Sequence, residues 1–387
     1  MQATISTKTL KHAAVIGRET VWRDSKIRDY GYGGWVRVHV ENGTATLSGS
    51  DMDSDCFVTM PATDTLSGLM TMQADTFHKA VMAAAKSKAP AVRIANGGDV
   101  ATIGAITMPC DAPADDKIVT PTPLEEQAPA EATIIMGQQG LFDMLTAVRS
   151  AVSTEETRYY LNGVYLQCHN GQLRAVATDG HRLATYDSRL KVEWPEHWDN
   201  PTIDGGSRVN VIVPAKLVDL ILRTLKASTR EERATIELTI SRITVTMGAT
   251  VIAGKLIDGT YPDYQRVGGG GTITMAGFDL ATIGATIKAA SLERGESKVV
   301  LRREGCEIRT GAGGSTRHAL AGVTWDAPAI AFNPTHIRDI AQSYGDRATE
   351  VDVSMADGPD KLGATSPALI TAPGSGLRWV LMPLRID

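Results

Sequence analysis

The densest group of polar residues able to do chemistry in this sequence is Thr178, Asp179, His181 and Arg182. A carboxylate near a histidine is typical of general acid–base catalysis, so this group is the candidate for an enzyme site. A hydrolase would also need a nucleophile against the histidine, and no GxSxG, P-loop, HExxH or CxxC motif is present. A turn accounts for the same residues, because a short acceptor side chain followed by Gly180 favours chain reversal. The sequence therefore favours a turn and a protein that is not an enzyme.

The four cysteines give no sign of a metal centre. Cys56, Cys110, Cys168 and Cys306 are widely separated, and no two of them have the spacing of metal ligands. They are expected to be reduced and structural, and the sequence predicts no metal and no cofactor.

The composition bounds the class of protein. A chain of 387 residues suits two or three domains, and 43% hydrophobic residues are enough to bury their cores. No apolar run approaches the eighteen residues of a membrane span, and the first residues lack the apolar block of a signal peptide. A cytoplasmic protein without membrane contact is expected. The formal charge of −5 argues against a positive field over the whole molecule, but a basic inner surface remains compatible with it.

The polar group must be positioned by a hairpin. Strand-like alternation over residues 164–167 and 172–177 is interrupted by His169-Asn170-Gly171, which is typical of a hairpin turn. Asn170-Gly171 precedes Thr178-Asp179 by the same spacing as Asn42-Gly43 precedes Ser50-Asp51. This offset of 170 − 42 = 128 residues indicates an internal repeat.

The repeat extends along the chain as three rounds of helices and strands. Apolar spacing predicts helices over residues 7–17, 75–86, 138–152, 214–227, 278–292 and 333–344, with Ser6 or Thr7, Asp75 and Asn333 as N-caps. Strands are expected between them, including 44–47, 91–95, 100–108, 235–254 and a hairpin over 298–310. Proline-rich and glycine-rich junctions cover 109–132 and 255–271, and a surface loop is expected over 191–210. The fold class is α+β, with three similar domains over residues 1–122, 132–257 and 272–387.

The outer faces of the helices in the first two domains carry mainly lysine and arginine. An ordinary solvated helix face usually mixes both signs of charge. Taken alone, the bias does not exclude ordinary solvated faces, but its recurrence in repeated domains favours a basic surface. Three similar domains with their basic faces on one side would form an arc.

Four motifs carry a family resemblance. YYLNG at 159–163, ATDGHRLA at 177–184, KLIDGTYPDYQRV at 255–267 and VLMPLR at 380–385 stand in the order and approximate spacing of the bacterial β sliding clamp, the processivity factor of the replicative DNA polymerase (DNA polymerase III subunit beta). The sequence resembles that family strongly from about residue 157 to 267 and clearly at the last motif.

The resemblance implies three DNA-clamp domains per chain, each with two helices packed on antiparallel sheets, and a homodimer that closes head to tail into a six-domain ring around double-stranded DNA without reading its sequence. The channel would be lined by Lys8, Lys11, Arg18, Lys79, Lys86, Arg149, Lys216, Arg223, Lys226, Lys288 and Arg338.

The resemblance also implies a peptide-binding groove between the second and third domains, used by the replicative polymerase, the clamp loader and other proteins with a clamp-binding motif. Its matching residues are Leu161, Thr178, Gly180, His181, Arg182, Leu183, Pro262, Arg266, Val267, Asn333, His336, Val380, Met382, Pro383, Leu384 and Arg385. Such a groove suits a short extended peptide with one or two large apolar side chains and a polar anchor.

A different class of function remains open from the residues alone. A non-catalytic repeat protein could bind another protein without encircling DNA, and Leu161, Leu183 and Val380 could be ordinary strand core. Such a protein would keep the three domains but would not need uniformly basic helix faces.

Overall fold

The computed structural model describes residues 1–21, 34–110, 118–169, 172–191, 210–268, 273–289, 297–302, 305–309, 314–318, 329–345, 350–355 and 366–385. The predicted turn at Asn170-Gly171, most of the loop predicted over 191–210 and the predicted helix end at 290–292 lie outside the described residues. The chain forms two compact units: unit 1 comprises Met1–Phe142 and Lys216–Leu256, and unit 2 comprises Asp143–Ala215 and Ile257–Asp387.

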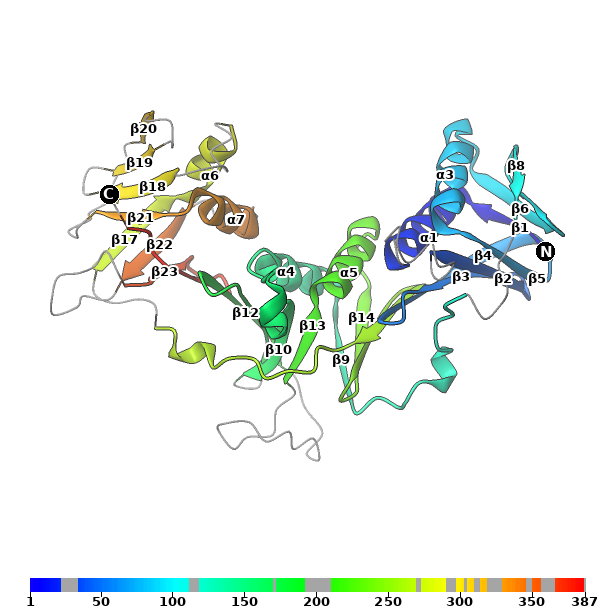
Figure 1. The fold of residues 1–387 in the computed structure, drawn as a ribbon, viewed down its shortest axis with the longest axis horizontal. Helices are drawn as coiled ribbons and strands as arrows, with labels where there is room; N and C mark the ends of the chain where they lie inside the picture. The colour runs from blue at the N-terminus through cyan, green and yellow to red at the C-terminus, as the bar shows by residue number, and fades with distance from the viewer. Residues whose placement is uncertain are drawn as a thin grey trace. The chain divides into compact units, whose positions relative to one another are not determined.

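Helices and strands follow one another in the same order three times, as β-α-β-β-β-β-α-β-β-β (Figure 1). The first round is β1 (Gln2–Ser6), α1 (Thr7–Thr20), β2 (Trp35–Glu41), β3 (Thr44–Ser50), β4 (Ser54–Leu66), β5 (Gly68–Gln73), α3 (Ala74–Ala84) with η1 (Ala85–Ser87), β6 (Ala91–Gly97), β7 (Val100–Ile103) and β8 (Ile106–Pro109). The segment that follows carries η3 (Leu124–Glu126).

The second round is β9 (Ala132–Gly137), α4 (Gln138–Arg149), η4 (Glu156–Leu161), β10 (Gly163–His169), β11 (Gln172–Thr178), β12 (Arg182–Lys191), β13 (Asn210–Pro214), α5 (Ala215–Ala227), β14 (Arg233–Leu238), β15 (Arg242–Met247) and β16 (Thr250–Lys255). After η5 (Tyr264–Arg266), the third is β17 (Ile273–Asp279), α6 (Leu280–Ala289), β18 (Lys298–Arg302), β19 (Gly305–Arg309), β20 (Ser315–His318), β21 (Ile330–Phe332), α7 (Pro334–Tyr344), β22 (Glu350–Met355), β23 (Ala368–Thr371) and β24 (Leu377–Leu381). The predicted α+β class is confirmed, and the predicted domain boundaries stay a prediction.

The strands of unit 1 form one antiparallel sheet. Its main path is β8-β7-β6-β1-β4-β16-β15-β14-β9, and β3, β2 and β5 branch from β4. β4 joins the first round to the second, because Ser54 to Val58 pair with Gly254 to Thr250 of β16.

Unit 2 contains two antiparallel sheets, ordered β13-β10-β11-β12-β24-β23-β22-β17 and β20-β19-β18-β21. The predicted hairpin is confirmed as β10 and β11, with Tyr165 opposite Val176. β12 then pairs with β24, which places Leu183 opposite Val380 although they are far apart in sequence. The second and third rounds therefore share one sheet.

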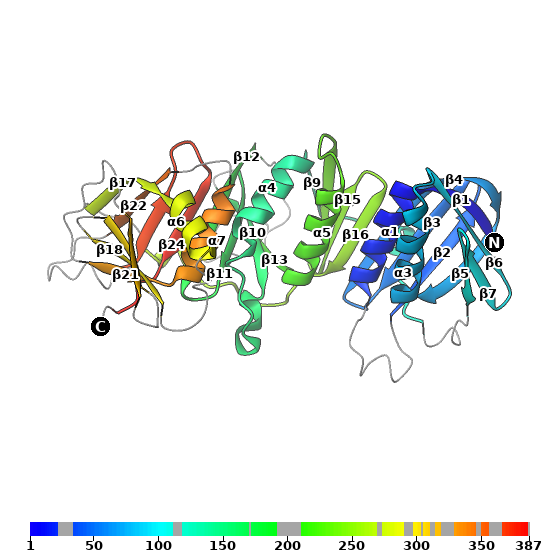
Figure 2. The ribbon, with the colours of Figure 1, turned by 90° about the horizontal axis from the view of Figure 1, so that it is seen from above.

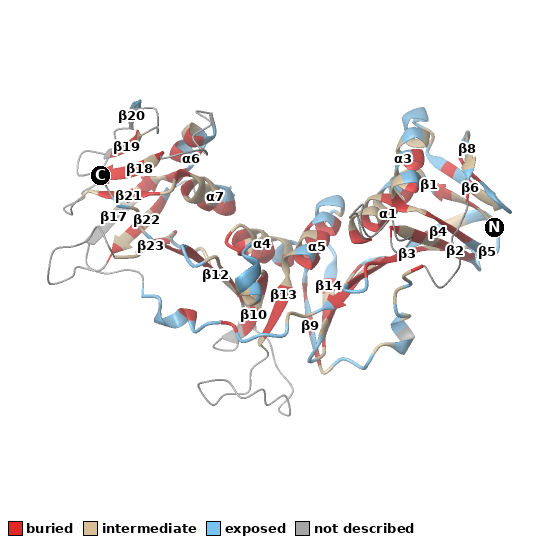
Figure 3. Ribbon diagram, viewed as in Figure 1, coloured by how far each residue is buried: buried red, intermediate tan, exposed pale blue. Residues whose placement is uncertain are grey.

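Helices bury their predicted apolar faces on these sheets. α1 packs beside α3 in unit 1 and α6 beside α7 in unit 2, as Figure 2 shows within each unit. Buried residues follow one side of each helix (Figure 3). The predicted core positions of α5 are all buried, namely Leu217, Val218, Ile221, Leu222 and Leu225.

The 128-residue repeat is also visible in hydrogen bonds. Ser50 Oγ accepts from the amide of Met52, and Asp51 Oδ1 accepts from the amides of Asp53 and Ser54. The corresponding turn, 128 residues later, repeats each bond: Thr178 Oγ1 accepts from Gly180, and Asp179 Oδ1 accepts from His181 and Arg182. Side chain-to-backbone bonds of this kind fix a turn from within the turn itself, so its shape is set locally.

Several predicted boundaries are wrong for identifiable reasons. α1 continues past Gly17 to Thr20, because Gly17 is a packing position where a Cβ would lie 2.7 Å from a Leu47 methyl group. Asp75 is not an N-cap: Gln73 holds that position, and Asp75 accepts a 2.7 Å bond from Arg18 Nε. The single strand predicted over 100–108 is two strands, β7 and β8, since Gly104 turns the chain with φ of +62°.

The predicted caps at the other helices have mixed outcomes. Ser6 holds the N-cap position of α1 without a side-chain bond, whereas Asn333 caps α7 by accepting a 2.9 Å bond from the Thr335 amide. Phe278 belongs to β17 and not to the helix predicted from residue 278. Helix ends depend on such tertiary contacts as much as on local sequence.

Cys56, Cys110 and Cys306 are buried and form no disulfide bond, and burial raises the pKa of the Cys56 thiol to about 12. No group of three or more histidine, cysteine, aspartate or glutamate residues able to hold a metal ion occurs among the described residues. Within the same residues, no helix is long and apolar enough to cross a membrane.

Candidate functional site

The polar group at 178–182 is a closed turn. Asp179 Oδ1 accepts hydrogen bonds from two backbone amides, as described above. Its second oxygen, Oδ2, accepts a 3.0 Å hydrogen bond from Arg182 Nε. Thr178 Oγ1 donates to the Arg182 carbonyl at 2.7 Å, and Gly180 has φ of +89°, which glycine adopts without strain. Asp179 is thus engaged in holding the turn, as the sequence predicted.

An apolar cluster lies against this turn in unit 2. It consists of buried Leu161, Val176, Leu183, Ile212, Tyr261, Tyr264 and Val380, with Tyr160, Tyr165, Ile257 and Leu369 packed against it. These residues come from η4, the central strands, η5 and the segment before it, and β23 and β24. The structure therefore brings together Leu161, Leu183 and Val380, three of the residues predicted for the groove.

The segment 257–268 is fastened to the central strands by tyrosines. The ring of Tyr261 stacks on Tyr165 with centroids 4.5 Å apart, and the Tyr264 hydroxyl donates to Gln167 Oε1 at 2.6 Å. Arg174, held by two bonds to Asp187, also donates to that hydroxyl at 3.4 Å. Sequence reasoning missed Tyr165, Tyr261 and Tyr264 as site residues, although Tyr261 and Tyr264 stand inside the motif at 255–267.

Exposed apolar side chains border the cluster. In the described part of unit 2, the exposed large hydrophobic residues are Tyr159 (54%), Val267 (43%) and Met382 (41%). Each is close in sequence to a cluster residue, and the Met382 amide donates to the His181 carbonyl at 2.9 Å. Exposed large apolar residues beside a buried apolar cluster are compatible with an interaction surface. We call the cluster with these three residues the peptide surface, after the groove that the resemblance implies; its binding of peptide stays a prediction.

The remaining predicted groove residues differ in exposure. Gly180, His181, Pro262, Arg266 and Arg385 are exposed, and Thr178, Asn333, His336, Pro383 and Leu384 are partly buried. The Leu384 amide donates to the Ala331 carbonyl at 2.7 Å, which ties the last motif to β21. The Asn333 side chain is engaged as the cap of α7.

His336 gives the stability of the fold a testable pH response. Burial, followed by the Arg182 charge, lowers the pKa of His336 from 6.5 to about 4. Between these values the unfolded chain binds more protons than the folded one, so stability is expected to fall as the pH decreases through this window. His336→Gln removes the group, and thermal unfolding from pH 7 to pH 4 is expected to show a smaller drop in Tm for the variant. The same drop in both proteins would contradict this prediction.

The predicted channel residues of unit 1 fall into two groups. Lys8 and Lys11 of α1, Lys79 of α3, Lys86 of η1 and Lys226 of α5 are exposed, and within the described residues none forms an ion pair. Arg18 pairs with Asp75 at 2.7 Å, Arg223 lies 3.6 Å from Glu19, and Lys216 pairs with Asp51. We call the first group the five free lysines.

In unit 2 the predicted channel residues are fewer. Lys288 of α6 is exposed and Arg149 of α4 is partly buried. Arg338 of α7 is 19% exposed and donates to Asp339 Oδ1 at 2.7 and 3.1 Å. Its charge is therefore already balanced by a neighbouring carboxylate.

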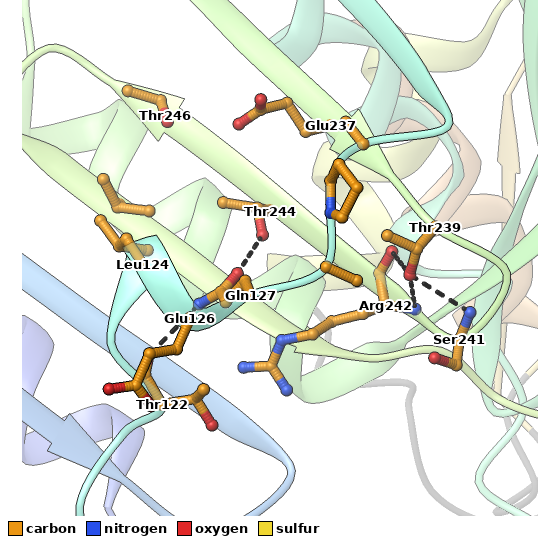
Figure 4. A pocket seen from close by; sticks show the side chains of 14 residues that line it. Thr122, Leu124, Glu126, Gln127, Glu237, Thr239, Ser241, Arg242, Thr244 and Thr246 are labelled. Carbon is orange, nitrogen blue, oxygen red and sulfur yellow. Dashed lines mark hydrogen bonds between the residues drawn. The ribbon is translucent and has the colours of Figure 1, made fainter.

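A cavity of about 430 Å³ lies in unit 1 between residues 122–130 and the face of β14 to β16 (Figure 4). Gln127 and Thr244 are hydrogen-bonded across it at 3.1 Å. None of the predicted site residues lines it, and the one arginine in its wall, Arg242, pairs with Asp55. The cavity thus offers no uncompensated positive charge to a ligand.

Comparison with known proteins agrees with the fold. Residues 136–263 match the family model of the DNA polymerase III beta subunit, central domain. A curated β sliding clamp from Caulobacter vibrioides is 29% identical over 264 residues, which are 64% of this chain and 64% of that relative. The matched stretch therefore spans less than two thirds of its length.

Solved structures extend the likeness to the whole chain. The sliding clamp (DNA polymerase III subunit beta) from Bartonella birtlesii, crystallised with griselimycin, is 25% identical with a TM-score of 0.79, covering 100% of both chains. The matched family model, the curated relative and the solved structures are all bacterial β sliding clamps. The Caulobacter crescentus clamp is also 25% identical, with a TM-score of 0.77 over 100% of both chains.

The likeness to β sliding clamps accounts for the convergence of the motifs. All four motifs supply residues of the apolar cluster, and ATDGHRLA also supplies the turn beside it. The roles of the individual side chains in binding DNA or peptide stay predictions.

Proposed function

We propose that the protein is a DNA sliding clamp, a non-catalytic accessory subunit that encircles duplex DNA and tethers the replicative polymerase. The observation that carries this proposal is the structural likeness to sliding clamps over the full length of both chains. Two copies would join head to tail, and the three domains of each would contribute to a closed ring.

The helix faces support contact with duplex DNA. The five free lysines are long and exposed and have no carboxylate partner within the described residues, so they are suited to phosphate. Contacts of this kind carry no sequence information and weaken steeply with salt, which allows a ring to slide. Retention then depends on topology and not on affinity.

The peptide surface supports binding of client proteins. A short peptide that buries about 300 Å² of apolar surface at roughly 25 cal/mol per Å² gains about 7 kcal/mol before ordering costs, which suits micromolar single-site affinity. The polymerase, a clamp loader and other proteins with a similar motif would share this surface in turn.

Retention on circular DNA tests the proposal. Protein loaded by a clamp loader onto a nicked circular plasmid is expected to stay with the DNA during gel filtration and to leave when one restriction cut makes the plasmid linear. Negative-stain electron microscopy of the free protein is expected to show rings with a central hole.

The control is a linear plasmid whose ends are blocked by bound protein, which is expected to retain the clamp. Equal retention on open linear and circular DNA would overturn encirclement. No association with either form would favour a repeat protein that binds only other proteins.

A further inference from the structure

Arg182 differs from the other polar groove residues predicted by resemblance, because its side chain is only 9% exposed and all three of its nitrogens are engaged. Nε donates to Asp179 Oδ2 at 3.0 Å, Nη1 to Asp339 Oδ2 at 2.8 Å, and Nη2 to the Ser150 carbonyl at 2.5 Å. Its guanidinium carbon also lies 6.0 Å from the centroid of the Trp379 ring.

These partners come from four separate parts of unit 2. Asp179 belongs to the turn before β12, Ser150 follows α4, Asp339 lies on α7, and Trp379 lies on β24. Arg182 is therefore the residue at which these four elements meet. Two residues of the apolar cluster are direct neighbours of this contact: Leu183 follows Arg182 in β12, and Val380 follows Trp379 in β24.

The charge of Arg182 is already balanced. Two carboxylates face it, and Asp339 in turn accepts from Arg338 through its other oxygen. An acidic group of a bound peptide would meet a cation with two existing partners in a buried position. Breaking such a pair leaves a buried charge uncompensated, which is unfavourable.

We propose that Arg182 is a positioning residue of the peptide surface and not a peptide ligand. It holds the turn that carries His181 and Leu183 against α7 and β24, with Asp339 as its essential partner. This proposal rests on the proposed function, because it assumes that the surface binds peptide. Without the Arg182 bonds the two sides of the surface would have to be ordered during binding, which lowers affinity.

The guanidinium shape is part of the proposal. Three acceptors in three directions require the planar fork of arginine, and an ammonium group at one point cannot reach all of them. Arg182→Lys is therefore expected to weaken peptide binding as Arg182→Gln does, although it keeps the charge.

The experiment measures affinity for a fluorescent five-residue peptide with a polar first residue and leucine and phenylalanine at its end. Asp339→Asn is the central variant, since it is isosteric and lies on α7. It is expected to weaken binding about tenfold, as are Arg182→Gln and Arg182→Lys, and the double variant Arg182→Gln with Asp339→Asn is expected to lose no more than either alone.

Arg309→Gln is the matched control, because it removes an arginine paired with Glu307 at 3.3 Å on β19, outside this set of contacts. Its affinity is expected to match wild type. A second peptide with its polar residue replaced by alanine is expected to lose the same factor in wild type and in Arg182→Gln, since Arg182 does not touch the peptide.

Two outcomes would overturn the proposal. One is unchanged affinity in Asp339→Asn together with a loss in Arg182→Gln, which would make Arg182 a direct ligand. The other is unchanged affinity in every Arg182 and Asp339 variant. Failure of the proposed function is distinguishable, because wild-type protein would then not bind the peptide at all.

Discussion

Replacing Leu183 and Met382 together by alanine is expected to weaken peptide binding about 100-fold, since the two truncations remove roughly 3 kcal/mol of apolar contact. Leu183 is buried in the cluster and Met382 is 41% exposed at its rim. Fluorescence anisotropy with the labelled peptide measures the change. Thermal unfolding must accompany it, because truncating a buried leucine costs about 2–5 kcal/mol of stability.

Leu166→Ala is the matched control for this experiment. Leu166 is buried to a similar extent on β10 but is not part of the apolar cluster. It is expected to lower the Tm as Leu183→Ala does while leaving peptide affinity unchanged. If both leucine variants weakened peptide binding equally, the effect would come from lost stability and the surface would be misplaced.

Changing the five free lysines to glutamine is expected to weaken association with duplex DNA strongly and to flatten its salt dependence. Each phosphate contact contributes about 0.9 to the slope of log affinity against log salt concentration, so losing several contacts lowers the slope by several units. Affinity for a short duplex measured at three or more salt concentrations gives both quantities. The fold is expected to be unchanged, since the five side chains are exposed.

Lys216→Gln provides the contrast on the same helix as Lys226. Lys216 donates to the Thr20 carbonyl at 2.9 Å and pairs with the buried Asp51, so its loss is expected to lower the Tm and to change DNA affinity little. A loss of DNA affinity in Lys216→Gln as large as that of the fivefold variant would contradict this division of the basic residues.

Apolar periodicity predicted the helices well, because the side of each helix that meets a sheet is set by spacing alone. All five core positions of α5 and the inward residues of α6 are buried as expected. The hairpin and the closed turn could also be predicted, since Asp179 and Gly180 act within their own few residues. Local chemistry was enough in these cases.

Features that depend on a distant partner could not be predicted. Gly17 resembles a helix stop until Leu47 is seen against it, and Asp75 resembles a cap until Arg18 reaches it. The same limit affects the basic residues: the sequence places Lys79 and Lys216 on similar helix faces, but only the folded chain brings Asp51 to Lys216. Tyr261 and Tyr264 are a different case: they stand in the motif at 255–267, but the stacking of Tyr261 on Tyr165 depends on a distant strand.

The pairing of β4 with β16 links the two sides of the junction over residues 109–132 independently of the junction itself. Backbone bonds between residues 54–58 and 250–254 connect the regions on either side of that junction without passing through it. After a protease cut within the junction, the two chain fragments would still be held together by the hydrogen bonds of the β4–β16 pair. They are therefore expected to co-purify. Two fragments divided at this junction and produced separately are expected to reassemble when mixed. The first fragment alone would expose an unpaired strand edge and would tend to aggregate.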